Sequence, residues 1–166
     1  ALNGFVIRGI SSNIPFQAAL LAHPKFVAGD FNTGFIAEHY GKGFHAEDVP
    51  HADPAFLVAL AAFVNRRYRA RASGISGQLA GHGVKVGEQF VVVELGPEGK
   101  HVHHAVSVSD FQGKTGASAV TVGDKRYQIE SDFALGAVRV QGTANGKPFT
   151  AQVERGAGKN PLALRV

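Results

Sequence analysis

The stretch from Asp53 to Ala72 reads DPAFLVALAAFVNRRYRARA, and it decides what kind of fold this chain can have. Asp53 is a good helix N-cap and Pro54 suits the first helical position, so the stretch predicts one helix. Residues 55–64 are all apolar, and a helix that is apolar on every side has to be enclosed. Polar residues return only at Asn65, so we expect the C-terminal end of the helix to reach solvent.

A series of short strands follows this helix and can supply the enclosure. Two tight hairpins are marked by Gly123-Asp124 and Asn145-Gly146, because such turns need positive φ at a central residue. We expect an α+β fold in which an antiparallel β-barrel of about seven to eight strands wraps the long helix, since closure removes the exposed edges of a sheet. The expected strands are 89–95, 101–108, 117–122, 126–131, 137–142, 148–154 and 162–166.

The N-terminal segment, up to residue 44, predicts short helices. A helix over 14–22 should end at His23-Pro24, because the residue before a proline is pushed out of the α region. A second helix over 34–40 can be capped by Asn32 or Thr33. Helices this short are not stable alone, so the segment needs a larger body to pack on.

Residues 9–40 of this segment carry motifs that resemble a known family. SNIPF (12–16), HPKF (23–26) and NTGFI (32–36) resemble the C-terminal end of a biotin carboxylase domain, as found in α subunits of biotin-dependent acyl-CoA carboxylases. The tail IAEHY (36–40) is similar to propionyl-CoA carboxylase α in particular. Gly41 is a departure, because those proteins commonly carry proline there.

The resemblance implies a division of the chain. Residues 1–44 would be the C-terminal remnant of a biotin carboxylase domain, and residues 45–166 the helix-in-barrel domain that links the α subunit to the carboxyltransferase β subunit. The resemblance is specific over the first quarter of the chain and covers the rest only in outline. The absence of methionine and the end inside an expected strand indicate an excised piece, with at least one barrel strand missing.

For the parent enzyme, the resemblance implies a ligase that carboxylates biotin with ATP and bicarbonate and transfers the carboxyl group to an acyl-CoA. Its cofactors would be biotin, ATP and Mg, and its compartment the bacterial cytoplasm or the mitochondrial matrix. The absence of cysteine fits a reducing compartment. The chain has no ATP-binding glycine loop and no lysine between methionines for biotinylation, so we expect no catalytic, cofactor-binding or metal site in it.

The expected partners are the carboxyltransferase β subunit and the biotin carboxylase and biotin carrier domains of the same chain. The candidate contact is the glycine-rich connection SGISGQLAGHGVKVG, residues 73–87, where the resembling family has a hook-shaped loop on the partner subunit. A flexible linker is the alternative, since composition permits either. The residues that would lie in the contact or at its rim are Ile75, Leu79, His82, Val84, Arg69 and Arg71.

Nucleic-acid binding is another class to weigh, because the formal net charge is +4 and four arginines lie within residues 66–71. A solvated helix end is the simpler account, since cations near a helix C-terminus favour its dipole. A nucleic-acid-binding barrel would also need exposed aromatic side chains beside the cations, for which Tyr127 and Phe149 are the candidates. We therefore expect no nucleic-acid partner.

A ligand-binding barrel of lipocalin type is the alternative function. It requires an empty lumen, which the apolar helix would fill, and a cavity lined by Phe56, Leu60 and Phe63 would favour it. The HVHHAV motif at residues 101–106 invites a metal site, but alternate residues of a strand face opposite sides, so at most two of its histidines could ligate together. No apolar run approaches the roughly 20 residues that span a bilayer, so we expect no membrane contact.

Overall fold

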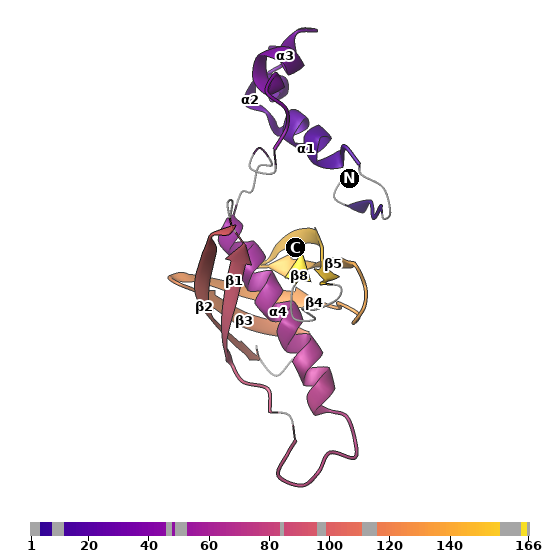
Figure 1. The fold of residues 1–166 in the computed structure, drawn as a ribbon, viewed down its shortest axis with the longest axis vertical. Coiled ribbons are helices and arrows are strands. Elements are labelled where there is room, and N and C mark those ends of the chain that lie inside the picture. The colour runs from indigo at the N-terminus through magenta and orange to yellow at the C-terminus, as the bar shows by residue number, and fades with distance from the viewer. Residues whose placement is uncertain are drawn as a thin grey trace. The chain divides into compact units, whose positions relative to one another are not determined.

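The computed structural model describes residues 4–7, 12–45, 48, 53–83, 85–95, 99–110, 116–156 and 164–165. The chain separates into two compact units, Ala1–Ala52 and Asp53–Val166. The first unit contains short helices, and the second contains one long helix with antiparallel strands (Figure 1). The assignment of residues 1–44 and 45–166 to two different domains of a larger enzyme stays a prediction.

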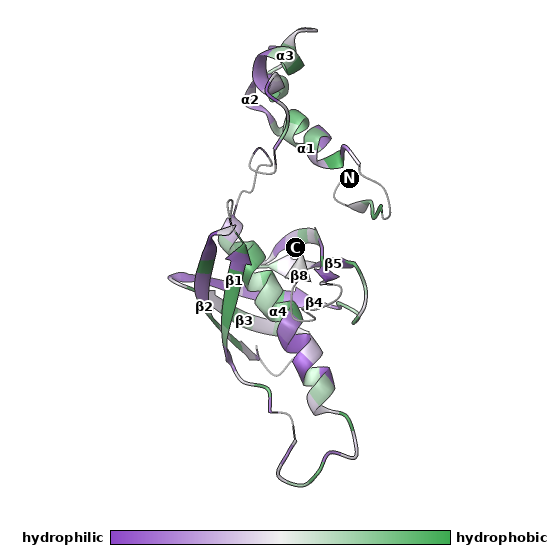
Figure 2. Ribbon diagram, in the orientation of Figure 1, coloured by the Kyte–Doolittle hydropathy of each residue, from purple (hydrophilic) through white to green (hydrophobic). Residues whose placement is uncertain are grey.

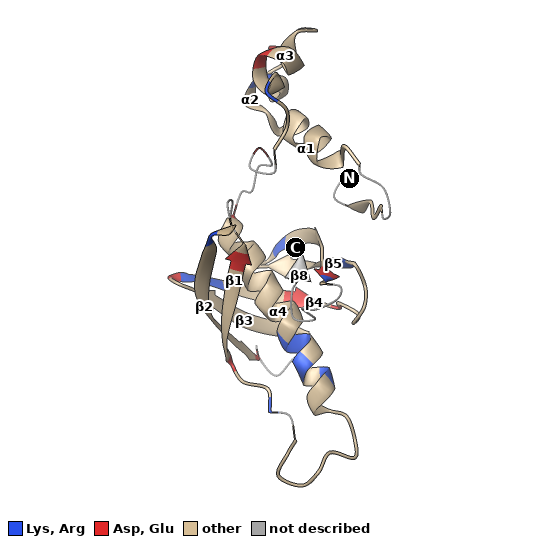
Figure 3. Cartoon of the chain, viewed as in Figure 1, with Lys and Arg blue, Asp and Glu red and all other residues tan. Residues whose placement is uncertain are grey.

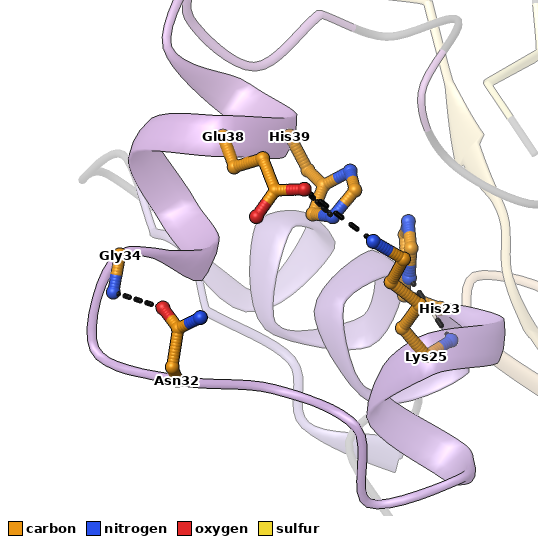
Figure 4. Close-up of polar contacts among 6 residues, drawn as sticks. All are labelled: His23, Lys25, Asn32, Gly34, Glu38 and His39. Atoms are coloured by element: carbon orange, nitrogen blue, oxygen red, sulfur yellow. Dashed lines mark hydrogen bonds and ion pairs between the residues drawn. The ribbon is translucent and has the colours of Figure 1, made fainter.

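The first unit contains α1 (Ile14–Ala22), α2 (Pro24–Val27) and α3 (Phe35–Tyr40). The predicted helix over 14–22 is confirmed, and it ends at His23, whose ψ of 131° is extended, as the following proline requires. The side-chain Oδ1 of Asn32 accepts a hydrogen bond from the Gly34 N–H at 2.7 Å, directly before α3 (Figure 4). The four-residue helix α2 was not predicted, because a single turn carries no periodic pattern.

Aromatic rings make the small core of the first unit. The ring of Phe35, which is buried, lies 5.0 Å from that of His23 and 4.6 Å from that of His39. Beside the two histidines, Lys25 Nζ lies 3.4 Å from Glu38 Oε1 (Figure 4). Large apolar side chains remain exposed in this unit: Phe5, Val6, Ile7, Leu21, Val27, Phe31 and Ile36. So much exposed apolar surface is consistent with the expectation that the segment packs on a larger body.

The second unit is organised around α4 (Pro54–Ser73), which confirms the predicted long helix. Its N-terminal half is apolar and buried, and its C-terminal half is hydrophilic (Figure 2). An α-helix has about 3.6 residues per turn, so the buried residues between Val58 and Val64 cover about two turns. The fully enclosed residues of the helix are Val58, Ala59, Leu60, Ala62, Phe63 and Val64.

The strands form a six-stranded antiparallel sheet in the order β1-β2-β3-β4-β5-β6. The hairpin between β3 and β4 turns at Gly123 with φ 59°, and the hairpin between β5 and β6 turns at Asn145 and Gly146 with φ 50° and 77°, so both predicted hairpins are confirmed. The six strands are Gln89–Leu95, His101–Asp110, Ala117–Val122, Lys125–Ser131, Arg139–Ala144 and Lys147–Gln152.

This sheet curls around α4 as a half-barrel (Figure 1). Among the described residues β1 and β6 are the two edges of the sheet, so the expected closed barrel and its strand count are not confirmed. The expected strand over 148–154 is divided at Val153, whose side chain turns into the core. Beyond it β7 (Glu154–Arg155) pairs with β8 (Leu164–Arg165) in a separate ladder.

Gly142 marks the closest approach of β5 to β4. It pairs with Ser131, and a Cβ at this position would collide with the backbone carbonyl oxygen of Glu130. We expect Gly142→Ala to lower the free energy of unfolding by about 1–3 kcal/mol, because the two strands must move apart. Gly87→Ala is the matched control, since a Cβ there meets no atom within 4 Å. Equal denaturation midpoints for the two variants would contradict the prediction.

Asp53 joins the start of α4 to the sheet. The predicted side-chain cap is wrong: the Asp53 carboxylate makes no hydrogen bond to the helix N–H groups and instead accepts one from Lys125 Nζ at 2.9 Å and one from the Tyr127 hydroxyl at 2.8 Å. These two hydrogen bonds hold the pKa of Asp53 below its ordinary value. The sheet competes successfully for this carboxylate because it offers a cation and a largely buried hydroxyl.

The stability of the second unit should fall at alkaline pH through Tyr127. Burial, with the hydrogen bond to Asp53, raises the pKa of Tyr127 to about 12 from an ordinary value of 10.0. The folded state therefore holds the phenol proton more tightly than the unfolded state, so this stabilisation is complete below pH 10.0 and is lost as the pH rises through about 12. Urea unfolding across this range should show the loss, and Tyr127→Phe should flatten it. An unchanged slope in the variant would oppose the assignment.

Candidate interaction surface

The loop between α4 and β1 begins with a side-chain cap on the helix end. The two hydrogens of the Gln78 amide Nε2 are shared among three carbonyl oxygens, those of Ala72 at 3.2 Å, Ser73 at 3.0 Å and Ile75 at 2.9 Å. The last carbonyls of a helix lack partners within the helix, so this amide provides one for Ser73 and a further one for Ala72, whose carbonyl also accepts from the Ile75 N–H at 3.3 Å. Sequence reasoning missed Gln78, although a long polar side chain just beyond a helix end is the available signal.

The remainder of the loop projects past the C-terminal end of α4 and returns to β1 (Figure 1). Gly77 and Gly81, both with φ 82°, bracket its far turn, in which the His82 N–H donates to the Leu79 carbonyl at 2.9 Å. Glycine is favoured at both positions because side chains rarely adopt positive φ. The loop therefore extends beyond the helix end, and the hydrogen bonds of Gln78 fix its first residues to that end.

The predicted contact residues lie on this loop or at its base. Ile75 is 54% exposed and Leu79 is 77% exposed, and His82 is also exposed. Val84 lies outside the described residues. Arg69 and Arg71 are exposed on the last turns of α4, with the Arg69 guanidinium 5.8 Å from the ring centroid of Phe90. The structure thus gathers the two arginines and Ile75 at the helix end and sets Leu79 and His82 in the far turn.

The other two arginines of the cluster are structural, which corrects the interpretation of a simply solvated helix end. Arg66 Nη1 lies 2.5 Å from Asp110 Oδ1 and ties α4 to β2, and this hydrogen bond lowers the pKa of Asp110. Arg67 Nη2 donates to the Phe133 carbonyl at 3.4 Å. Of the four arginines, Arg69 and Arg71 are the exposed pair, and Arg66 and Arg67 are partly buried.

Comparison with known protein families identifies the domain that α4, the loop and the sheet form. The family model of the propionyl-coenzyme A carboxylase BT domain matches residues 57–166, which include most of α4, the loop and all the strands. The chain belongs to this family. The match begins inside α4 and includes every strand of the curled sheet, so the helix, the loop and the sheet described above are the BT domain.

Relatives extend the likeness over most of the chain. It is 34% identical over 140 residues to the propionyl-CoA carboxylase alpha chain of Ruegeria pomeroyi, covering 81% of this chain and 21% of that protein. The mitochondrial alpha chain of Caenorhabditis briggsae is 30% identical over 159 residues, 92% of this chain and 22% of that protein. Biotin carboxylase 1 of Bacillus subtilis is 56% identical over 36 residues, 22% of this chain and 8% of that protein. The chain spans about a fifth of the length of the two alpha chains.

The aromatic candidates for nucleic-acid stacking are inside the BT domain. The ring centroid of Phe56 lies 5.8 Å from that of Tyr127 and 5.1 Å from that of Phe149, and all three belong to the core or pack against it. The expectation that Tyr127 and Phe149 could lie on an exposed face is therefore wrong. Strand alternation turned these side chains inward, where an apolar helix face covers them.

The three helix residues that were considered as the lining of a ligand cavity pack against the strands. Leu60 and Phe63 are fully buried in one core cluster with residues of β2 to β5, and Phe56 packs against it. A groove of about 570 Å³ lies elsewhere, over β3, β4 and β5. It is lined by Gly116, Ala117, Glu130, Ser131, Asp132, Gln141, Gly142 and Thr143. Its Ser131 hydroxyl donates to the Gln141 carbonyl at 2.6 Å and so has a structural role.

The histidine motif is divided between two faces of β2, as predicted. His101 and His103 are exposed, whereas His104 Nε2 lies 2.9 Å from Glu94 Oε2 of β1. In the described part of the chain, no three His, Cys, Asp or Glu side chains are grouped as a metal ion would require. Over the same residues, no helix combines the length and apolar character needed to cross a membrane.

Proposed function

We propose that this chain is the part of a propionyl-CoA-type carboxylase α subunit that docks onto the carboxyltransferase β subunit. Membership of the BT family and the likeness to alpha chains support the parent enzyme. The observation that carries the contact surface is the projecting loop, on which Ile75 and Leu79 are 54% and 77% exposed. Burying an aliphatic side chain of this size is worth about 1.5–3 kcal/mol, so both are effective anchors for a partner.

The loop is suited to docking because its base is ordered before binding. Gln78 holds the first turn on the helix carbonyls, and α4 is itself fixed in the half-barrel by its buried half. Ordering a loop on binding costs about 0.5–1.5 kcal/mol per immobilised side chain, and a loop that is already anchored avoids part of that cost. This favours a contact element over a purely flexible linker.

The role that follows from this proposal is to position the active sites of the parent enzyme. The domain would hold the biotin carboxylase and carboxyltransferase active sites within reach of the biotin carrier, which raises effective concentration and adds no chemistry of its own. ATP, bicarbonate, Mg and biotin would act in the other domains, and the first unit would be the end of the biotin carboxylase domain. The compartment would be the bacterial cytoplasm or the mitochondrial matrix.

The direct test is binding of the α subunit to its carboxyltransferase subunit before and after Ile75 and Leu79 are changed to Asp. Loss of binding with an intact fold is the expected result. Unchanged affinity would remove the loop from the interface.

A further inference from the structure

The net positive charge of the chain is concentrated on one segment. Residues 65–87 contain four arginines and one lysine and no Asp or Glu. The whole chain has 17 Lys and Arg against 13 Asp and Glu, so the residues outside this segment have 12 cations against 13 carboxylates. The segment that forms the end of α4 and the projecting loop therefore accounts for all of the excess charge. Figure 3 shows its cations on the C-terminal half of α4 and on the limb that returns to β1.

Three of these five cations are available to a partner. Arg66 and Arg67 are engaged within the domain by Asp110 and the Phe133 carbonyl. Arg69 and Arg71 are exposed at the base of the loop, and Lys85 is exposed on its returning limb. These three exposed cations thus lie before and after the exposed Ile75 and Leu79 in the sequence, and Arg69 also lies over the ring of Phe90. An apolar centre with cations around it has the layout of an interface core and its rim.

We infer that the surface that receives this loop is a carboxylate-rich protein face with an apolar recess for Ile75 and Leu79. The inference rests on the proposed function and adds the chemistry of the partner site. Complementary charge at an interface rim mainly accelerates association and excludes wrong partners, whereas the buried apolar anchors determine how long the complex lasts.

A protein face is favoured over nucleic acid because no fully exposed aromatic ring accompanies the cations in the part of the chain that the structure describes. Residues 73–87 contain no Phe, Tyr or Trp. Of the nearby rings, Tyr68 is covered by the Arg155 guanidinium at 4.6 Å and accepts a hydrogen bond from the Gly136 N–H at 3.0 Å, and Phe90 is half-buried against the core. Single strands need rings on which bases can stack, and exposed aliphatic side chains do not provide them.

The test is a charge reversal in the α subunit. The loop variant combines Arg69→Glu, Arg71→Glu and Lys85→Glu, and the control variant reverses three exposed cations of the sheet, Arg126→Glu, Arg139→Glu and Lys147→Glu. Both change the net charge equally. At about 50 mM salt the loop variant should associate with the carboxyltransferase subunit at least about tenfold more slowly, and the control about as fast as the parent. At about 1 M salt, where the Debye length is about 3 Å, the difference should vanish.

Each outcome has one meaning. Equal slowing of both variants, or no slowing of either, overturns the inference of a carboxylate-rich face. If Ile75→Asp with Leu79→Asp still abolishes binding in that case, the docking proposal stands. If no variant affects binding, the docking proposal itself fails. Tight, salt-sensitive binding of an oligo(dT) strand that only the loop variant loses, with unaltered subunit association, would assign the basic segment to nucleic acid.

Discussion

The Leu60→Ala variant is expected to lose about 2–5 kcal/mol of its free energy of unfolding, which is a large part of the 5–15 kcal/mol typical of a domain. Leu60 has 0% exposure and belongs to the core cluster that α4 forms with the surrounding strands. Removing three carbons leaves a cavity between a helix and a curled sheet that are each held in place by other contacts. Neither element can collapse fully into the space.

Leu79→Ala makes the same chemical change at a position with 77% exposure, so it is the matched control. Surface substitutions of this kind usually change stability by less than about 0.5 kcal/mol. Urea unfolding, followed by circular dichroism, measures both variants at one protein concentration. A loss below about 1 kcal/mol for Leu60→Ala, or equal losses for both, would show that α4 is not enclosed as described.

The second large effect is expected on binding. Changing both Ile75 and Leu79 to Asp should weaken the association of the α subunit with the carboxyltransferase subunit by about a thousandfold or more, because two interface anchors of about 2 kcal/mol each are lost and two carboxylates are left facing the contact. Titration calorimetry or surface plasmon resonance gives the dissociation constants. The free energy of unfolding should remain near that of the parent, since both side chains are exposed.

The control for this experiment is Val91→Asp with Leu95→Asp on β1. These side chains are 65% and 74% exposed, so the pair resembles the loop pair in exposure and matches it in charge change, but it belongs to a strand of the sheet. It should leave the affinity within about twofold of the parent. If the loop pair and the β1 pair weaken binding equally, the effect comes from added negative charge and the loop has no special role.

Much of the fold could be predicted because its signals are local. The apolar run after Asp53-Pro54 identified a helix that must be enclosed, and the two glycine-containing turns identified the hairpins that let the sheet curl around it. The predicted strand ends were less accurate in two places. Strand β5 covers Arg139–Ala144 where 137–142 was expected, and the strand expected over 148–154 is interrupted at the buried Val153. The segment chosen as the candidate contact does form an exposed loop, and its role as a contact stays a prediction.

Side-chain pairing across long sequence separations could not be predicted. Asp53 was expected to cap its own helix, yet it bonds to Lys125 and Tyr127, which are 72 and 74 residues away. Of four neighbouring arginines, Arg66 and Arg67 make hydrogen bonds within the domain and the other two are exposed, and no property of residues 66–71 separates the two pairs. Which group a side chain meets depends on how the sheet bends around the helix.

The sequence by itself determined that α4 is buried along half its length, that hairpin-linked strands follow it, and that the chain's excess charge lies in residues 65–87. These properties follow from residue order and from the periods of helix and strand. The tertiary structure alone decided that the sheet forms a half-barrel around α4, that Gln78 anchors the loop, and that Arg69, Arg71 and Lys85 remain exposed with Ile75 and Leu79. The physical reason is that several polar groups compete for each hydrogen-bond partner. Which group succeeds depends on the residues that the fold brings close together, and these lie far apart in the sequence.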